Sequence, residues 1–149
     1  MTFEKILEKK PTDGTVSMQV FIPKEIHQFA ADYVANQPPI EYDWWLATGD
    51  IYLNFLLKGI ANIRRSPESF TAKREKKEVF EQGKVYTVIY CPSHVNTQIE
   101  AIREKFGGVS RHGKSTSKKW SGRVPKRQIF SFLLGLGFKE TNQSTIKYN

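Results

Sequence analysis

The chain has little of what disulfide and metal chemistry require. Its single cysteine, Cys91, permits no internal disulfide and no cysteine-based zinc cluster, and the apolar run around it predicts a small buried side chain in a reducing compartment. The three histidines, His27, His94 and His112, are scattered, without metal-ligand spacing to another His, Cys or carboxylate. A Gly-x-Ser-x-Gly elbow is also lacking. We therefore expect no metal, no cofactor and no enzymatic activity.

Long apolar runs are lacking as well. The longest largely apolar stretch, residues 129–138, is too short to span a bilayer, and the amino-terminal MTFEKILEKK is charged where a secretory signal is apolar. We expect a cytoplasmic monomer without membrane insertion. With 149 residues, 39% hydrophobic and 26% charged, the chain suits one compact domain, or two very small ones sharing a core.

Acidic residues are scarce in the second half of the chain. Residues 1–69 carry 7 lysines and arginines against 9 acids, whereas residues 70–149 carry 16 against 6. The densest stretch, 103–127, holds nine basic residues and one acid, Glu104. The second half is therefore expected to meet an anionic partner.

What the chain does contain is an internal repeat. GTVSMQVFIP (14–23) matches GKVYTVIYCP (83–92) at one offset, through glycine, valine, an aromatic residue and a closing proline. Further along, NFLL (54–57) recurs as SFLL (131–134) at a slightly larger offset, which implies an insertion between the matches. The order of elements is therefore expected to be the same twice.

The sequence of each copy predicts a strand followed by two helices. β-Branched and aromatic residues predict strands over 15–22 and 84–91, each closed by proline. A helix follows each strand and ends near residue 36 or 107, and a second helix begins near Thr48 or Pro125. The tail STIKYN (144–149) is strand-like, and the charged connection over 64–82 is interpreted as an exposed linker or wing.

This inventory is typical of a winged helix-turn-helix unit. We predict an α+β fold in which two such units, 1–69 and 70–149, share one central antiparallel sheet as an internal dimer. Pairing of 15–22 with 84–91 would form that sheet, because each unit of about 70 residues is marginal alone. The alternative is a single irregular α+β domain in which the repeat is a coincidence.

The stretch GVSRHGKS (108–115) has the spacing of a nucleotide-binding P-loop. A P-loop needs a strand before it and a helix after it, so that backbone N–H groups converge on the phosphates. Here the preceding segment is helical, and the residues that follow, TSKKWSGRVP, offer no apolar helical face. Nucleotide hydrolysis is therefore not expected.

The same basic segment has the composition of a DNA contact. Lysine and arginine neutralise phosphates, short hydroxyls bond phosphate oxygens, and residues 113–120 could enter a major groove. The predicted contacts in the second copy are Arg111, Lys114, Ser115, Ser117, Lys118, Lys119, Arg123, Lys126 and Arg127. The basic cluster of the first copy consists of Lys58, Arg64 and Arg65. The alternative is a solvated basic loop without a partner.

The first copy carries an acidic connector, PPIEYDWWLATGD (38–50), which would repel nucleic acid. Trp44, Trp45 and Trp120 are interpreted as core anchors because tryptophan occurs in the connectors of both copies. The first copy is thus expected to bind a protein or a second protomer. The alternative function is an adaptor within a secretion or replication complex, and RNA binding is a third and less favoured option.

The chain resembles TraN, the small cytosolic transfer protein of Gram-positive conjugative plasmids. The resemblance covers nearly the whole chain and depends on GTVSMQVFIP/GKVYTVIYCP, the NFLL/SFLL pair and the overall size. It implies a tandem winged helix-turn-helix fold and sequence-specific binding of double-stranded DNA near a transfer origin or promoter. It further implies a regulatory or accessory role in conjugation, with transcription regulation as one form of that role.

Overall fold

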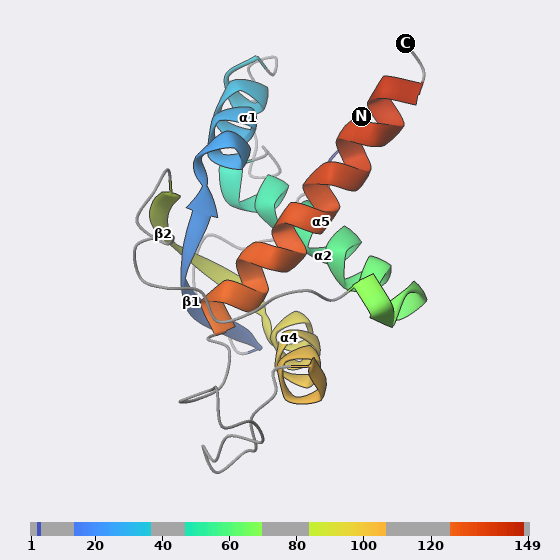
Figure 1. Ribbon diagram of the computed structural model, residues 1–149. Coiled ribbons are helices and arrows are strands. Elements are labelled where there is room, and N and C mark those ends of the chain that lie inside the picture. The colour runs from blue at the N-terminus through green and yellow to red at the C-terminus, as the bar shows by residue number, and fades with distance from the viewer. Residues whose placement is uncertain (1–2, 4–13, 37–46, 70–83, 107–125, 148–149) are drawn as a thin grey trace.

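The computed structural model describes residue 3 and residues 14–36, 47–69, 84–106 and 126–147 of the 149-residue chain. The described part is α+β, as predicted, with strand–helix–helix order occurring twice (Figure 1). In chain order the elements are β1 (Thr15–Pro23), α1 (Lys24–Ala35), α2 (Thr48–Arg65), the 3-10 turn η1 (Pro67–Ser69), β2 (Lys84–Pro92), α4 (Ser93–Phe106) and α5 (Lys126–Lys147). The helices begin where the sequence predicted, and α1 and α4 also end where it predicted.

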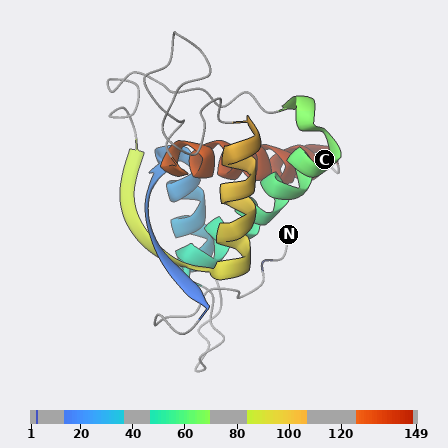
Figure 2. The ribbon, with the colours of Figure 1, turned by 90° about the horizontal axis from the view of Figure 1, so that it is seen from below.

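The strands β1 and β2 form a two-stranded antiparallel ribbon. Its register runs from Thr15 opposite Pro92 to Pro23 opposite Lys84, so it is symmetric about its central pair. The predicted pairing of the two equivalent strands is confirmed. Figure 2 shows the strands together along one side of the molecule, with the helices on the other. The ribbon therefore has one face toward the helices and one face away from them.

The inner face of the ribbon packs on the helices. Successive side chains of a strand point to opposite faces, so alternate residues of both strands enter the core. The buried residues on this face are Met18, Val20, Ile22, Ile89 and Cys91.

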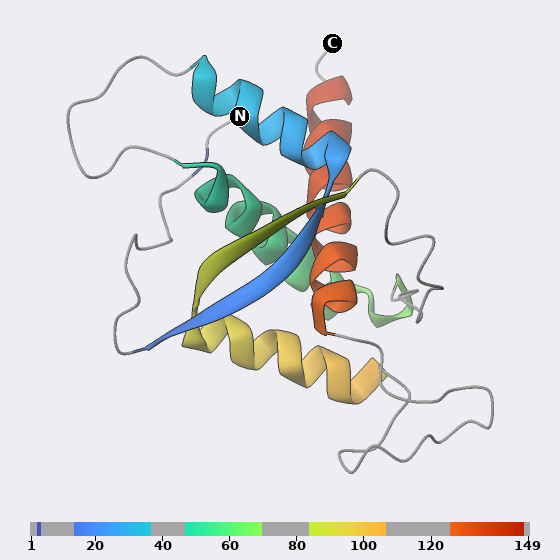
Figure 3. The ribbon, with the colours of Figure 1, turned by 90° about the vertical axis from the view of Figure 1, so that its left-hand side faces the viewer.

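The helices α1 and α4 follow the two strands directly and bury matching positions. Ile26 and Ala30 of α1 are buried, as are Val95 and Ile99 of α4. A spacing of four residues places each pair on one face of its helix. Seen from the ribbon side, α1 and α4 lie at the two ends of the ribbon, and α2 and α5 lie behind it (Figure 3).

The helices α2 and α5 cross with their backbones very close together. A Cβ on Gly59 would lie 1.9 Å from the carbonyl oxygen of Leu133, and a Cβ on Gly137 would lie 1.8 Å from the carbonyl oxygen of Phe55. Only glycine permits such an approach of one backbone to another. Each helix thus presents the same kind of contact to the other, as in the isologous interface of a symmetric dimer.

The contacts at this crossing show that the sequence alignment of α2 with α5, the last helix of each repeat, is shifted by one residue. The reciprocal contacts match Phe55 with Leu133, whereas the NFLL/SFLL alignment matches Phe55 with Phe132. Phe55 and Leu133 are both 0% exposed, while Phe132 is only partly buried. The alignment of NFLL with SFLL is therefore wrong by one residue, because the helix face that packs determines the equivalence and the residue types do not.

An aromatic cluster fills the core beside α1. The ring of Phe55 lies 5.4 Å from that of Phe3, 5.7 Å from that of Phe29 and 5.5 Å from that of Phe138, measured between centroids. Two of these pairs are edge-to-face, the geometry that the ring quadrupole favours. Phe55 is therefore the hub that joins residue 3, α1 and both central helices.

The predicted strand at the carboxyl end is wrong. Residues 144–147 of STIKYN continue α5, which ends at Lys147. Extending an existing helix adds one backbone hydrogen bond per residue, whereas a strand needs a partner to pair with. The predicted linker over 64–82 also begins later than expected, because Arg64 and Arg65 end α2 and residues 67–69 form η1. Residues 70–83 lie outside the described part.

Cys91 is a buried free thiol, which confirms its predicted burial. Burial raises the pKa of the thiol to about 11, and the charge of Lys126 acts in the opposite direction. The folded thiol keeps its proton between pH 9 and about 11, where an unfolded thiol, whose pKa is 9.0, loses it. The contribution of this group to the free energy of unfolding is therefore complete below pH 9 and decreases as the pH rises toward 11.

We expect Cys91 of the folded protein to react with iodoacetamide at pH 7 at least about 100-fold more slowly than in urea. The difference in pKa alone supplies this factor, because the thiolate is the nucleophile. Alkylation followed by mass spectrometry, with and without denaturant, measures both rates. Equal rates would contradict the buried position of the thiol.

Candidate nucleic-acid interface

The face of the ribbon that points away from the helices mixes polar and apolar side chains. Tyr86 is 53% exposed and Val88 is 43% exposed, and these are the exposed large apolar side chains of the described residues. Exposed apolar groups framed by polar ones mark interaction surfaces. We call this surface the ribbon outer face; it consists of Ser17, Gln19, Phe21, Tyr86, Val88 and Tyr90.

One end of the ribbon outer face carries an aromatic pair and an arginine. Phe21 and Tyr86 are cross-strand partners with ring centroids 5.4 Å apart. The guanidinium carbon of Arg127 lies 5.7 Å from the centre of the Phe21 ring, within the range of a cation–π interaction. Arg127 is exposed, and none of the described carboxylates forms an ion pair with it. A mobile or bound anion can therefore reach it.

The position of Arg127 depends on contacts between α5 and its neighbours. The Ser131 hydroxyl donates a hydrogen bond of 2.8 Å to the carbonyl oxygen of Phe21, which joins the second turn of α5 to β1. Lys126 Nζ donates to Asn96 Oδ1 and lies 3.4 Å from Glu100 Oε1, both on α4. Lys126 is thus engaged with α4, whereas Arg127 extends beside the ribbon outer face.

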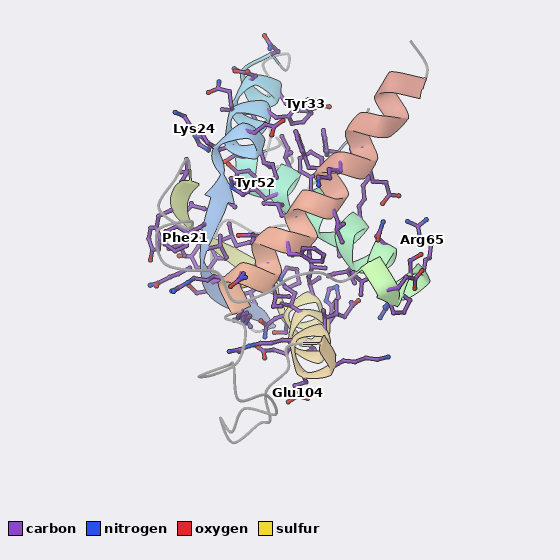
Figure 4. The ribbon with its side chains drawn as sticks, in the orientation of Figure 1. Phe21, Lys24, Tyr33, Tyr52, Arg65 and Glu104 are labelled. Carbon is purple, nitrogen blue, oxygen red and sulfur yellow. The ribbon has the colours of Figure 1, made fainter. Side chains whose placement is uncertain are left out.

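The basic cluster of the first copy lies elsewhere. Lys58 Nζ donates a hydrogen bond of 2.8 Å to Thr141 Oγ1, and Arg65 lies 3.1 Å from Glu140 Oε1. Arg64 lines a small pocket between α2 and α4. Arg65 and Phe21 are on opposite sides of the molecule in Figure 4. The structure therefore does not place this cluster on the same surface as Arg127.

Most of the predicted contacts lie outside the described part of the chain. These residues are Arg111, Lys114, Ser115, Ser117, Lys118, Lys119 and Arg123, together with the P-loop-like stretch 108–115 and the three tryptophans. The element before that stretch is the helix α4, as predicted, and not the strand that a P-loop requires. The DNA contacts of this segment stay a prediction.

Sequence reasoning did not single out the ribbon outer face. In β1 the polar residues Ser17 and Gln19 alternate with apolar ones, so their exposure could have been inferred from the period of two. In β2 the run VYTVIYC is apolar on both faces, and its most polar member, Thr87, points inward. The pairing register was needed to place Tyr86 and Val88 outside.

Two histidines lie among the described residues, away from the ribbon outer face. His27 Nδ1 lies 2.9 Å from the hydroxyl of Tyr52, which is buried, and His94 is exposed. Burial raises the pKa of Tyr52, and a hydrogen bond with Thr48 acts in the opposite direction. The described residues contain no group of three or more His, Cys, Asp or Glu that could hold a metal ion. None of their helices has the length and apolar character needed to cross a membrane.

Comparisons of the chain with protein-family models, with curated proteins and with solved structures found no match.

Proposed function

We propose that the protein binds double-stranded DNA and inserts the ribbon β1–β2 into the major groove. The observation that carries this proposal is the ribbon outer face, where hydrogen-bonding and apolar side chains lie side by side next to Arg127. The major groove of B-DNA is about 12 Å wide and admits a two-stranded ribbon, whose side chains then reach the base edges. Several DNA-binding proteins read sequence with such ribbons.

The charge distribution supports the same partner. The described ends of the basic segment 103–127 are the last turn of α4 and the first turn of α5, and Arg127 at the latter lies beside the ribbon outer face. Contacts of lysine and arginine with phosphates release counterions and supply most of the affinity for DNA of any sequence. We infer that Arg127 contacts a phosphate at the edge of the groove and that residues 107–125 add further contacts.

The regulatory or accessory role in conjugative transfer depends on the resemblance to TraN alone. The tandem winged helix-turn-helix arrangement depends on that resemblance and on the repeated order of strand and helices in the sequence. In the described residues the strands pair between the repeats, and the tail that would have supplied a further strand is helical. The ribbon therefore replaces segment 113–120 as our proposed element for base readout. The adaptor hypothesis depends on the acidic connector 38–50, of which residues 38–46 lie outside the described part.

We expect a labelled pool of random duplexes to bind the protein at low salt, with an affinity that falls steeply as salt is added. Arg127→Gln is expected to weaken binding to all sequences and to lower the slope of log K against log salt by about 1. Lys139→Gln is the matched control, since it removes one exposed positive charge from the same helix about 18 Å further along the axis. Fluorescence anisotropy over a salt series measures both quantities.

The outcomes separate the alternatives. Absence of duplex binding at low salt, or equal effects of Arg127→Gln and Lys139→Gln, would contradict the proposal. Lys118→Ala combined with Lys119→Ala tests the predicted contacts of the basic segment in the same assay. Competition by unlabelled duplex RNA as effective as that by duplex DNA would favour RNA as the partner.

A further inference from the structure

The two strands of the ribbon present different side chains on the outer face. At the offset of the repeat, the position of Ser17 holds Tyr86 and that of Gln19 holds Val88, whereas the third outward position keeps an aromatic ring in both strands. The inner face keeps two of its four positions: Val16 matches Val85 and Val20 matches Ile89, while Met18 and Ile22 match Thr87 and Cys91. At two of the three outward positions the chemistry of the two strands therefore differs.

The backbone of the ribbon is nevertheless symmetric. Gln19 lies opposite Val88 at its centre, and the register extends equally far in both directions. A ribbon with two identical strands in this register would present the same groups to the two halves of a DNA site, and palindromic sites mirror such two-fold symmetry. In this ribbon the two halves of a bound site would meet different groups.

The charges at the start of the two central helices differ between the repeats as well, independently of the strands. The helix crossing matches Phe55 with Leu133, and the same offset matches Gly49 of α2 with Arg127 of α5. The next residue in α2 is Asp50, whose carboxylate accepts a hydrogen bond of 2.9 Å from the Ala47 N–H. The first turn of α5 is therefore basic where the first turn of α2 is acidic.

From these two observations, and on the basis of the DNA-binding function proposed above, we propose that the ribbon recognises an asymmetric, non-palindromic duplex site in one orientation. Gln19 and Ser17 read one half by hydrogen bonds, since glutamine pairs with the N6 and N7 atoms of adenine and serine bonds to either kind of edge group. Val88 and Tyr86 read the other half by apolar contact, for which the methyl group of thymine is the available partner in the major groove. Arg127 holds the phosphate backbone on one side only.

The test is selection of bound sequences from random duplex DNA by the full chain and by two reciprocal variants. Ser17→Tyr with Gln19→Val makes the outer face of β1 resemble that of β2, and Tyr86→Ser with Val88→Gln does the opposite. All four side chains are exposed, and the changes leave the net charge unaltered, so the electrostatic attraction to duplex DNA is the same in the three proteins. Tyr86→Ser removes the ring contact with Phe21 and is expected to lower the thermal midpoint, so the selections are made well below the midpoint of each protein. The wild type is expected to select a non-palindromic sequence, and each variant a different palindrome.

Both variants should also bind the DNA sequence selected by the wild-type protein at least about tenfold more weakly than the wild-type protein does. Lys139→Gln, which lies away from the ribbon, should select the wild-type sequence. Two results would overturn the asymmetric readout while leaving DNA binding intact. One is that the wild-type protein selects a palindromic DNA sequence, and the other is that the variants select the same DNA sequence as the wild-type protein. Failure of the wild type to retain any duplex at low salt would overturn DNA binding itself, and the asymmetric readout with it.

Discussion

Gly59→Ala and Gly137→Ala are each expected to lower the free energy of unfolding by about 3 kcal/mol or more. The added Cβ would lie 1.9 Å from the carbonyl oxygen of Leu133 in one case and 1.8 Å from that of Phe55 in the other. These are backbone atoms within helices, so they cannot turn aside as the end of a flexible side chain can. The two helices must separate, and close packing around them is lost along the crossing.

Gly135→Ala is the matched control. Gly135 lies on α5, as Gly137 does, and a Cβ there would meet nothing within 4 Å. Alanine is expected to raise the stability at this position by about 0.5–1 kcal/mol, since glycine in a helix interior costs backbone entropy. Urea denaturation of the three variants, followed by circular dichroism, measures the differences. If all three substitutions had effects of the same sign, the close crossing of α2 and α5 would be wrong.

The crossing also matters for the proposed function. The helices α2 and α5 belong to different repeats and lie behind the ribbon (Figure 3). The Ser131 hydroxyl of α5 donates a hydrogen bond to the Phe21 carbonyl oxygen of β1, so a shift of α5 at the crossing would also displace the ribbon and Arg127. Folded Gly59→Ala protein should therefore bind DNA more weakly than the wild-type protein, although Gly59 does not belong to the ribbon outer face. Binding measured well below the thermal midpoint separates this effect from unfolding.

Phe55→Ala is expected to cost about 4 kcal/mol of stability, and Leu133→Ala about 3 kcal/mol. Both side chains are 0% exposed, and the ring of Phe55 contacts the rings of Phe3, Phe29 and Phe138. Removing either side chain leaves a cavity that the neighbouring helix backbones cannot fill, because the glycine contacts already hold them at their closest approach. A loss of this size is a large part of the stability of an ordinary domain.

Phe132→Ala distinguishes the packing register from the sequence alignment. Phe132 is partly buried, so its removal should cost only about 1–2 kcal/mol. The NFLL/SFLL alignment makes Phe132 the equivalent of Phe55 and predicts similar losses for the two. The same urea experiment decides between them: a loss for Phe132→Ala as large as that for Phe55→Ala would contradict the one-residue correction.

Local sequence patterns were sufficient for the elements and their order. Alternation of apolar residues in TVSMQVFIP, closed by proline, predicted β1, and apolar residues at helical spacing predicted α1 and α4. These signals are local, because a strand or a helix face depends on neighbours a few residues away. The tail was the exception: Thr145 and Ile146 favour a strand by type, yet the helix before them extends through both.

The sequence by itself determined that the chain repeats a strand and two helices, that its strands could pair antiparallel, and that its positive charge is concentrated after residue 70. The tertiary structure alone decided which face of β2 is exposed, because VYTVIYC is apolar on both faces and only pairing with β1 orients it. It also decided that Gly59 and Gly137 meet at the crossing and that Arg127 lies against Phe21. These contacts join residues far apart in the chain, and no local pattern records them.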